Sequence, residues 1–279
     1  MPSLDSYQGI PLLLPETAIL KALEQQLEQL IPYRSTFSAI VGDLGFMAVD
    51  NHVVDLTLSD QGLMTLPENF GHFSKLQTLD LSVNQLKSLP ETFGQLTGLQ
   101  SLYLRDNQLS TLPESFGNLK SLQELYLMRN QLSSLPASFG NLTRLQTLWL
   151  HENQLKSLPE SFGNLVNLKE LSLWDNQLKS LPESFGNLTN LHNLLFTGNP
   201  LAGMVALLWL VRTRSTFRQS WIPGSLFTYP LIQDLDPSSL QPLPTDSCPF
   251  CGTLGLVVGL EKQNGKKRVF CASCELQIS

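Results

Sequence analysis

Four cysteines stand in two close pairs near the end of the chain, and their spacing is that of a metal site. The pairs read Cys248-Pro-Phe-Cys251 and Cys271-Ala-Ser-Cys274, with 19 residues between them. Two residues between paired thiolates allow both sulfurs to reach one zinc ion at about 2.3 Å. Two disulfides or an iron–sulfur site are the alternatives, but disulfides conflict with an intracellular chain and iron–sulfur sites usually show other spacings. The pattern predicts one structural Zn²⁺, because four protein ligands leave no open position on the metal.

The segment between the cysteine pairs is predicted to form a β-hairpin. Residues 254–260 and 268–270 favour strands, and Gln263-Asn264-Gly265 between them favours a tight turn. With the four cysteines as ligands, residues 248–279 resemble a zinc ribbon. So small an element has little core and is expected to fold only with its metal. Four basic side chains cluster at the turn: Lys262, Lys266, Lys267 and Arg268. A nucleic-acid contact through them is an alternative function, although such a cluster in a domain of small net charge is usually a solvated turn.

A second group of residues has the composition of a protein-binding surface. Aromatic, arginine and methionine side chains recur in the middle of the chain at intervals of 23 residues, in neighbouring positions of each interval. The members of this group are Tyr103, Arg105, Tyr126, Met128, Arg129, Trp149, His151 and Trp174. Such side chains are enriched among the residues that dominate the binding energy of interfaces. They can act together only if the chain folds so that successive intervals lie side by side.

A 23-residue repeat sets this interval. The unit reads L-x-x-L-x-L-x-x-N-x-L-x-x-L-P-x-x-F-G-x-L. Six full units cover 53–75, 76–98, 99–121, 122–144, 145–167 and 168–190, and a truncated seventh covers 191–201. The unit resembles the intracellular leucine-rich repeats whose outer segments read L-P-x-x-F/I-G-x-L. This resemblance implies an α/β solenoid, a horseshoe with a parallel β-sheet on its concave face and helical caps, and a role in binding protein.

Each part of the unit has an expected structural role. Alternating leucines such as Leu79 and Leu81 predict a short strand with one face buried, and the strands of successive units should form a parallel sheet. The asparagine at the strand end, Asn84 in the second unit, needs backbone partners because its amide should be buried. Proline should begin a short outer helix, and the glycine after each phenylalanine should end the outer turn. The phenylalanines from Phe70 to Phe185 should stack as a spine.

Side chains between and after the strand leucines should face the open, concave side of the sheet. Tyr103, Tyr126 and Trp149 occupy the first of these positions, and Trp174 occupies a position two residues further along its unit. No layer covers this side, so about 600 Å² of aromatic surface would be left wet at about 150 Å² for each ring. We therefore predict that the group is a partner-binding face; the alternative is that aromatic residues simply suit strands. His151 is interpreted as a contact residue rather than a metal ligand or a base, because the open sheet offers it no pocket.

Both ends of a repeat array expose apolar surface and need caps. Upstream, residues 15–31 carry apolar side chains at helical spacing opposite glutamates and glutamines, which predicts an amphipathic helix. The expected domains are an N-terminal helical cap (1–52), the repeat array (53–201), a C-terminal capping helix (202–218), a linker rich in proline and serine (219–247) and the zinc ribbon (248–279).

Composition narrows the class of protein. Of the 279 residues 42% are hydrophobic, and the formal net charge of −6 argues against a protein that binds nucleic acid with its whole surface. The longest apolar stretch, 201–211, is shorter than the roughly 20 residues that cross a bilayer as a helix, and no secretory signal is visible. The predicted caps contain no cysteine, whereas secreted leucine-rich proteins close their ends with disulfides. We expect a soluble, cytoplasmic monomer.

Enzyme motifs of the common classes are missing from the sequence. The chain lacks G-x-x-x-x-G-K-[ST], H-E-x-x-H and G-x-S-x-G, and all of its cysteines are assigned to metal. We therefore expect a non-enzymatic interaction module, a scaffold whose aromatic face binds a protein and whose zinc ribbon supplies a second contact. A nucleic-acid-associated factor is the alternative, and an adaptor with ligase or signalling activity is the least favoured reading.

Overall fold

The computed structural model describes residues 3–35, 44–196, 198–200, 258–263 and 266–271. They fall into two compact units, Met1–Asn199 and Pro200–Ser279, and each unit is described by itself. The predicted C-terminal capping helix (202–218), the predicted linker (219–247) and three of the four cysteines, Cys248, Cys251 and Cys274, lie outside the described residues.

A hairpin and a helix open the first unit. They are β1 (Leu4–Tyr7), β2 (Ile10–Leu13) and α1 (Leu14–Leu27). Ile19, Leu20 and Leu23 are fully buried, so the helix packs through the apolar side that its sequence pattern predicts. The helix is shorter than the predicted range 15–31, because the chain turns into the left-handed region at Glu28, where φ is 54°.

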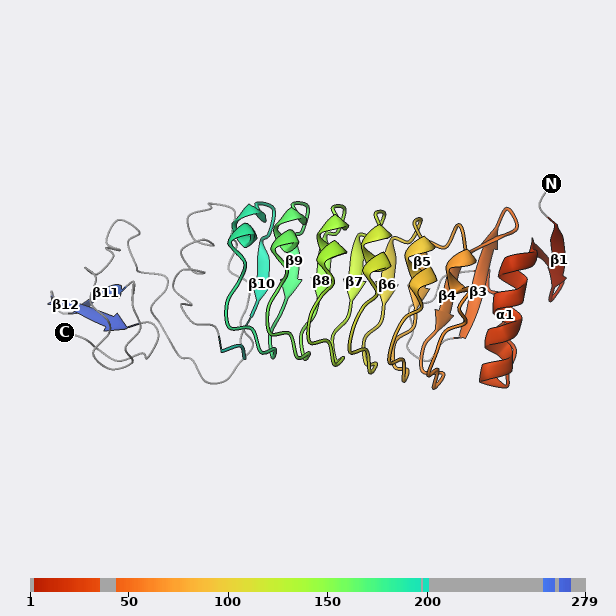
Figure 1. Ribbon diagram of the computed structural model, residues 1–279, viewed down its shortest axis with the longest axis horizontal. Coiled ribbons are helices and arrows are strands. Elements are labelled where there is room, and N and C mark those ends of the chain that lie inside the picture. Colours follow the sequence, from red (N-terminus) through yellow and green to blue (C-terminus); the bar gives the residue numbers. More distant parts are fainter. Residues whose placement is uncertain (1–2, 36–43, 197, 201–257, 264–265, 272–279) are drawn as a thin grey trace. The chain divides into compact units, whose positions relative to one another are not determined.

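Eight strands form one sheet in the first unit, and their order across the sheet follows the order along the chain from β3 to β10 (Figure 1). The strands are β3 (Leu44–Val49), β4 (His52–Leu58), β5 (Thr78–Asp80), β6 (Ser101–Tyr103), β7 (Glu124–Tyr126), β8 (Thr147–Trp149), β9 (Glu170–Ser172) and β10 (Asn193–Leu195). From β4 onward the pairing is parallel and in register, so that Leu79 pairs with Leu102 and Leu102 with Leu125. The predicted parallel sheet of the solenoid is therefore confirmed.

The N-terminal end of the sheet is closed in a way that the repeat pattern does not predict. Strand β3 pairs antiparallel with β4. The side chain of Glu16 in α1 is fully buried, and its Oε2 accepts the backbone N–H of Val53 in β4 at 2.7 Å. A buried carboxylate that accepts a backbone N–H thus joins the helix to the first strand of the array.

The outer side of the repeats consists of 3₁₀ helices. They are η1 (Phe70–His72), η2 (Glu91–Gln95), η3 (Glu114–Asn118), η4 (Ala137–Asn141), η5 (Glu160–Asn164) and η6 (Glu183–Asn187). The proline of the unit stands before the helix and not in its first turn, where it was predicted. Pro90 is extended at φ −67° and ψ 152°, and its carbonyl accepts the N–H of Phe93 at 2.9 Å. Because a 3₁₀ bond spans three residues, this proline supplies the first acceptor of the helix.

The asparagines after the strands form a buried ladder. Asn130 is 7% exposed; its Nδ2 donates to the carbonyls of Leu104 at 2.9 Å and Leu127 at 3.1 Å, and its Oδ1 accepts the N–H of Leu109 at 3.0 Å. Leu104 and Leu109 belong to the preceding repeat, so each asparagine ties two repeats together. The predicted backbone partners of these amides are confirmed.

The phenylalanines stack along the outer side of the array as predicted. Neighbouring rings from Phe70 to Phe185 are parallel within 7°, and their centroids lie 6.0 to 6.2 Å apart. Paired strands lie closer together, at about 4.8 Å. The array is therefore shorter along its sheet than along its outer side, and the sheet lines the inner, concave side of the bend.

The glycine after each phenylalanine has a role that the sequence interpretation missed. Gly117 lies inside η3 and does not adopt the left-handed backbone of a turn end. A Cβ on Gly117 would lie 2.3 Å from the backbone oxygen of Ser138 in the next repeat. The prediction that this glycine ends the turn is thus wrong, and its function is to let neighbouring outer segments approach.

The described part of the second unit is a β-hairpin, as predicted, although the strand bounds differ. Strands β11 (Val258–Gln263) and β12 (Lys266–Cys271) pair antiparallel, with Val258 opposite Cys271 and Gln263 opposite Lys266. Asn264 and Gly265 of the predicted turn lie outside the described residues. Among the described residues no helix is both long enough and apolar enough to cross a bilayer.

Candidate partner-binding face

The open face of the sheet brings three of the predicted aromatic residues into direct contact. Parallel register places Tyr103 opposite Tyr126 and Tyr126 opposite Trp149. The two tyrosine rings stack with centroids 4.9 Å apart, and Tyr126 meets Trp149 edge to face at 5.1 Å. The rings are half-buried because they cover one another. The predicted wet aromatic surface of about 600 Å² is therefore too large.

His151 and Trp174 extend this contact into the next position of the repeat. The His151 ring lies 5.9 Å from the Trp149 ring and stacks on Trp174 at 4.5 Å, with 14° between the planes. We call the resulting line of five rings the aromatic strip. It consists of Tyr103, Tyr126, Trp149, His151 and Trp174.

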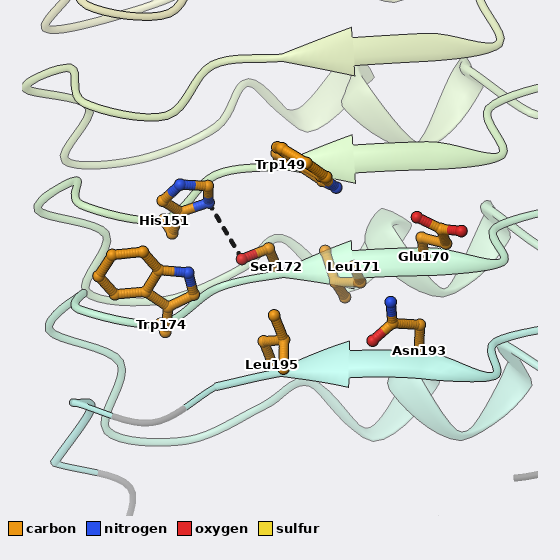
Figure 2. Close-up of a pocket in the computed structure, with 8 residues that line it drawn as sticks. All are labelled: Trp149, His151, Glu170, Leu171, Ser172, Trp174, Asn193 and Leu195. Atoms are coloured by element: carbon orange, nitrogen blue, oxygen red, sulfur yellow. Dashed lines mark hydrogen bonds between the residues drawn. The ribbon is translucent and has the colours of Figure 1, made fainter. Parts of the chain in front are cut away.

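A hollow opens beside the strip, over β9 (Figure 2). Strand β9 carries Ser172 at the position where β8 carries Trp149 and β10 carries Leu195. The small serine leaves a space of about 210 Å³ between these larger neighbours. Its walls are formed by Trp149, His151, Glu170, Leu171, Ser172, Trp174, Asn193 and Leu195. The expectation that the open sheet offers His151 no pocket is therefore wrong.

Residues before the central leucine of each strand also face the open side, and the sequence analysis did not assign this column to the binding face. They are Ser101, Glu124, Thr147, Glu170 and Asn193 in the strands from β6 to β10. Glu124 lies 3.4 Å from Ser101 Oγ and 3.5 Å from Tyr103 Oη. Burial, together with the Glu124 carboxylate, raises the pKa of Tyr126 to about 12. Residues two positions apart in a strand point to the same face of the sheet. Applied toward the N-terminus of each strand, this rule would have identified the column.

The two predicted arginines belong to a charged line along the edge of the open face. Arg129 Nε donates to Glu152 Oε1 at 3.0 Å, and its guanidinium lies 3.7 Å from Asp106 Oδ1. Arg105 lies 3.9 Å from the other oxygen of Asp106. Met128, the remaining member of the predicted group, directly precedes Arg129 in the sequence and is half-buried. Both arginines are therefore held by neighbouring carboxylates on the surface, where each pair contributes only modestly to stability.

The backbone beneath this charged line is left-handed in every repeat. The position is occupied by Asp60, Val83, Asp106, Arg129, Glu152, Asp175 and Gly198, with φ between 50° and 73°. Only the last of these is glycine, the residue for which this conformation carries no steric penalty. The array thus holds six non-glycine residues in a conformation that L-residues disfavour.

His151 is placed to contact a partner and is poorly placed to act as a base. Its Nδ1 lies 3.0 Å from Ser172 Oγ, which could suggest an activated serine. Ser172 is only 3% exposed, however, and within the described residues no carboxylate is hydrogen-bonded to the second ring nitrogen. Burial lowers the pKa of His151, so the ring is neutral at pH 7.

Only one of the four predicted metal ligands lies in the described part of the chain. Cys271 ends β12 opposite Val258, whereas the other three cysteines lie outside the described ranges. In the part of the chain that the structure describes, no group of three or more histidine, cysteine or acidic side chains could hold a metal ion.

Comparisons with protein families identify the repeats. The family model described as a leucine-rich repeat region matches residues 51–148, and a leucine-rich repeat model matches residues 144–165 and 167–188. None of the curated proteins compared with the chain matches it.

Several solved structures resemble the chain over about half of its length or more. A leucine-rich repeat protein of Leptospira interrogans is 38% identical over 52% of this chain, with a TM-score of 0.50. The structure of PEPR1–AtPEP1 is 32% identical over 67% of this chain, with a TM-score of 0.56, and the plant peptide hormone receptor RGFR1 in complex with RGF2 is 34% identical over 57%, with a TM-score of 0.51. This chain spans 37%, 29% and 26% of these three structures, respectively.

Proposed function

We propose that this leucine-rich repeat protein is a non-catalytic interaction module, which binds another protein through the open face of its sheet with the aromatic strip at the centre of the contact. The aromatic strip is the observation that carries the proposal. Five rings in mutual contact on an open face supply a large, rigid contact area, and rigid rings lose little side-chain entropy when they bind. We place this activity in a cytoplasmic monomer.

The pattern of variation between repeats supports the same surface. Outer positions such as Phe116 and Gly117 recur with the same residue in neighbouring units, because they hold the array together. The open-face positions change from repeat to repeat, as Tyr126, Trp149 and Ser172 illustrate. RGFR1, a peptide hormone receptor that resembles this chain, was solved in complex with RGF2. A polypeptide ligand is therefore the class of partner that we propose.

Truncation of the strip should remove binding without unfolding the protein. Trp149→Ala is expected to weaken binding of the partner by about 2 kcal/mol or more, as truncation of a hot-spot tryptophan does. The melting temperature should hardly change, because the Trp149 ring is only half-buried. The measurement is affinity purification from native lysate with the full chain, wild type beside Tyr126→Ala/Trp149→Ala, followed by titration of the recovered partner against Trp149→Ala.

A control variant tests whether binding depends on the strip or on exposed apolar surface in general. Met64 and Val166 are 62% and 42% exposed and lie outside the strand positions of the open face. Met64→Ala/Val166→Ala should retain the partner. Equal recovery from wild type and the strip variant, or a large fall in melting temperature with binding intact, would contradict the proposed function.

We also propose that Cys248, Cys251, Cys271 and Cys274 hold one structural zinc ion in the second unit. Four thiolates are a donor set that zinc prefers, and they leave no position for substrate. The hairpin of β11 and β12 supports the proposal, because it separates the two cysteine pairs and carries Cys271 at its open end, opposite Val258. The metal would supply folding energy there rather than chemistry.

The full chain purified without chelator is expected to contain one zinc per chain, because all four thiolates serve a single ion. Cys271→Ser should lose most of this zinc, and the amide protons of β11 and β12 should then exchange faster, whereas Ser273→Ala should keep the metal. Elemental analysis and hydrogen exchange make the two measurements. Two results would rule out the proposal. One is iron in place of zinc, and the other is four cysteines that react with an alkylating reagent only after reduction.

A further inference from the structure

We propose that the hollow over β9 receives a lysine or arginine side chain of the partner, which crosses the open face as a basic polypeptide segment. The inference rests on the proposed function and names the chemistry of the partner. Its basis is the lining of the hollow, where aromatic rings and a carboxylate stand around one small space.

The shape of the hollow suits a long side chain with a cationic end. Figure 2 shows His151 and Trp174 on one side of Ser172, with Glu170 and Asn193 on the other. The half-buried side chain of Leu195 adds apolar surface. Methylene groups pack on such surface, and a cation over an indole face is attracted by the ring electrons.

Glu170 is the carboxylate that the cation would meet. In the part of the chain that the structure describes, no lysine or arginine pairs with Glu170, whereas Glu152 and Asp106 are both paired with Arg129. Asn193 also lines the hollow, and its Oδ1 is an acceptor without a hydrogen-bond partner among the described residues. The walls of the hollow contain no lysine or arginine, and His151 is neutral at pH 7. The hollow therefore presents acceptors without a compensating positive charge.

The charge of the whole open face favours the same class of partner. Eight carboxylates occupy its columns and its left-handed edge: Asp55, Asp60, Asp80, Asp106, Glu124, Glu152, Glu170 and Asp175. Only two basic side chains, Arg105 and Arg129, lie among them. The other repeat positions carry the opposite balance, with seven basic and five acidic side chains. The negative potential is thus concentrated on the face that carries the aromatic strip, where it would attract a basic segment.

Other occupants fit the hollow less well. A phosphate or carboxylate would stand against Glu170 and would be repelled. A leucine or phenylalanine side chain would cover the Glu170 carboxylate without giving it a partner, and burial of an unpaired charge is strongly unfavourable. A basic side chain satisfies the carboxylate and uses the rings at the same time.

The probe for this inference is an octapeptide of alternating lysine and glycine, titrated into the full chain. The chain has four tryptophans, and the indole N–H signals of Trp149 and Trp174, assigned by single Trp→Phe variants, report on the hollow. Both signals are expected to shift and saturate. The same peptide with its lysines acetylated should bind at least about tenfold more weakly, because loss of one well-placed charge interaction of about 1.4 kcal/mol has this effect.

Two matched variants locate the contact. Glu170→Gln should lower the affinity for the lysine peptide about tenfold. Glu124→Gln, in the same column two strands away, should lower this affinity less than about twofold. Equal effects of the two variants would mean diffuse attraction to an acidic face and would overturn the inference. Equal binding of the acetylated peptide, which indicates an apolar occupant, or the lack of any saturable shift would overturn it as well.

The same variants distinguish this inference from the proposed function. A natural partner that is lost from Tyr126→Ala/Trp149→Ala but retained by Glu170→Gln would leave the binding face standing and refute the basic-side-chain site. Retention by both variants would refute the binding face itself.

Discussion

Asn130→Ala is expected to lower the free energy of unfolding of the repeat array by about 4 kcal/mol, because several buried backbone groups lose their partner at once. The amide of Asn130 binds the carbonyls of Leu104 and Leu127 and the N–H of Leu109. The site is 7% exposed, so water cannot replace these bonds without opening the repeat. Contacts between neighbouring repeats contribute to the stability of a solenoid, and this residue connects two repeats.

Denaturant unfolding measures the loss, and hydrogen exchange locates it. The amide proton of Leu109, which donates to Asn130, should lose protection in the variant, whereas that of Leu132, which donates to Asn153, should lose less. Asn141→Ala is the matched control, because Asn141 is exposed at the end of η4. A loss below about 1 kcal/mol, the net worth of a single hydrogen bond, would mean that the ladder contributes little to stability.

Gly117→Ala is expected to destabilise the array by about 3 kcal/mol through overpacking between repeats. The added Cβ would stand 2.3 Å from the oxygen and 2.8 Å from the carbonyl carbon of Ser138, and 2.5 Å from its Cβ. The obstacle is backbone, which cannot swing aside as a flexible side chain would. Relief requires the outer segments of two repeats to move apart, which would also separate the stacked rings of Phe116 and Phe139.

Gly98→Ala provides the comparison for this substitution. Its Cβ would meet the carbonyl oxygen of Leu76 at 3.4 Å, which is an ordinary contact, and its backbone is not left-handed. The free energy of unfolding should therefore change by less than about 0.5 kcal/mol, with the reduced freedom of the unfolded chain as a small gain. Similar losses for Gly117→Ala and Gly98→Ala in thermal and denaturant unfolding would show that close approach is not the reason for the glycine.

The repeat pattern predicted those parts of the fold that depend on side-chain periodicity. The alternation of Leu79 and Leu81 identified the strand, and the fixed interval of 23 residues identified the parallel register that places Tyr126 opposite Trp149. The buried asparagines were predictable for the same reason, because a polar residue at a constant position beside leucines must find backbone partners.

Features that depend on shape in three dimensions were not predictable in this way. The role of Gly117 depends on the approach of Ser138, a distance that no single repeat encodes. The hollow arises because the small Ser172 lies between Trp149 and Leu195, and its volume depends on where those side chains turn. The stacking of His151 on Trp174 joins two positions of the unit into one strip, a diagonal contact that reading each column separately does not reveal.

The left-handed position of each repeat gives this array room to evolve. Val83 and Arg129 hold there a conformation that costs non-glycine residues on the order of 1 kcal/mol each, and β-branched valine more than most. Glycine at any of these positions would raise stability and erase a surface side chain in one step, as Gly198 illustrates at the last repeat. A new surface charge can therefore be introduced in one repeat without changing the others. Stability lost in this way can be regained by a substitution to glycine at the same position of a different repeat.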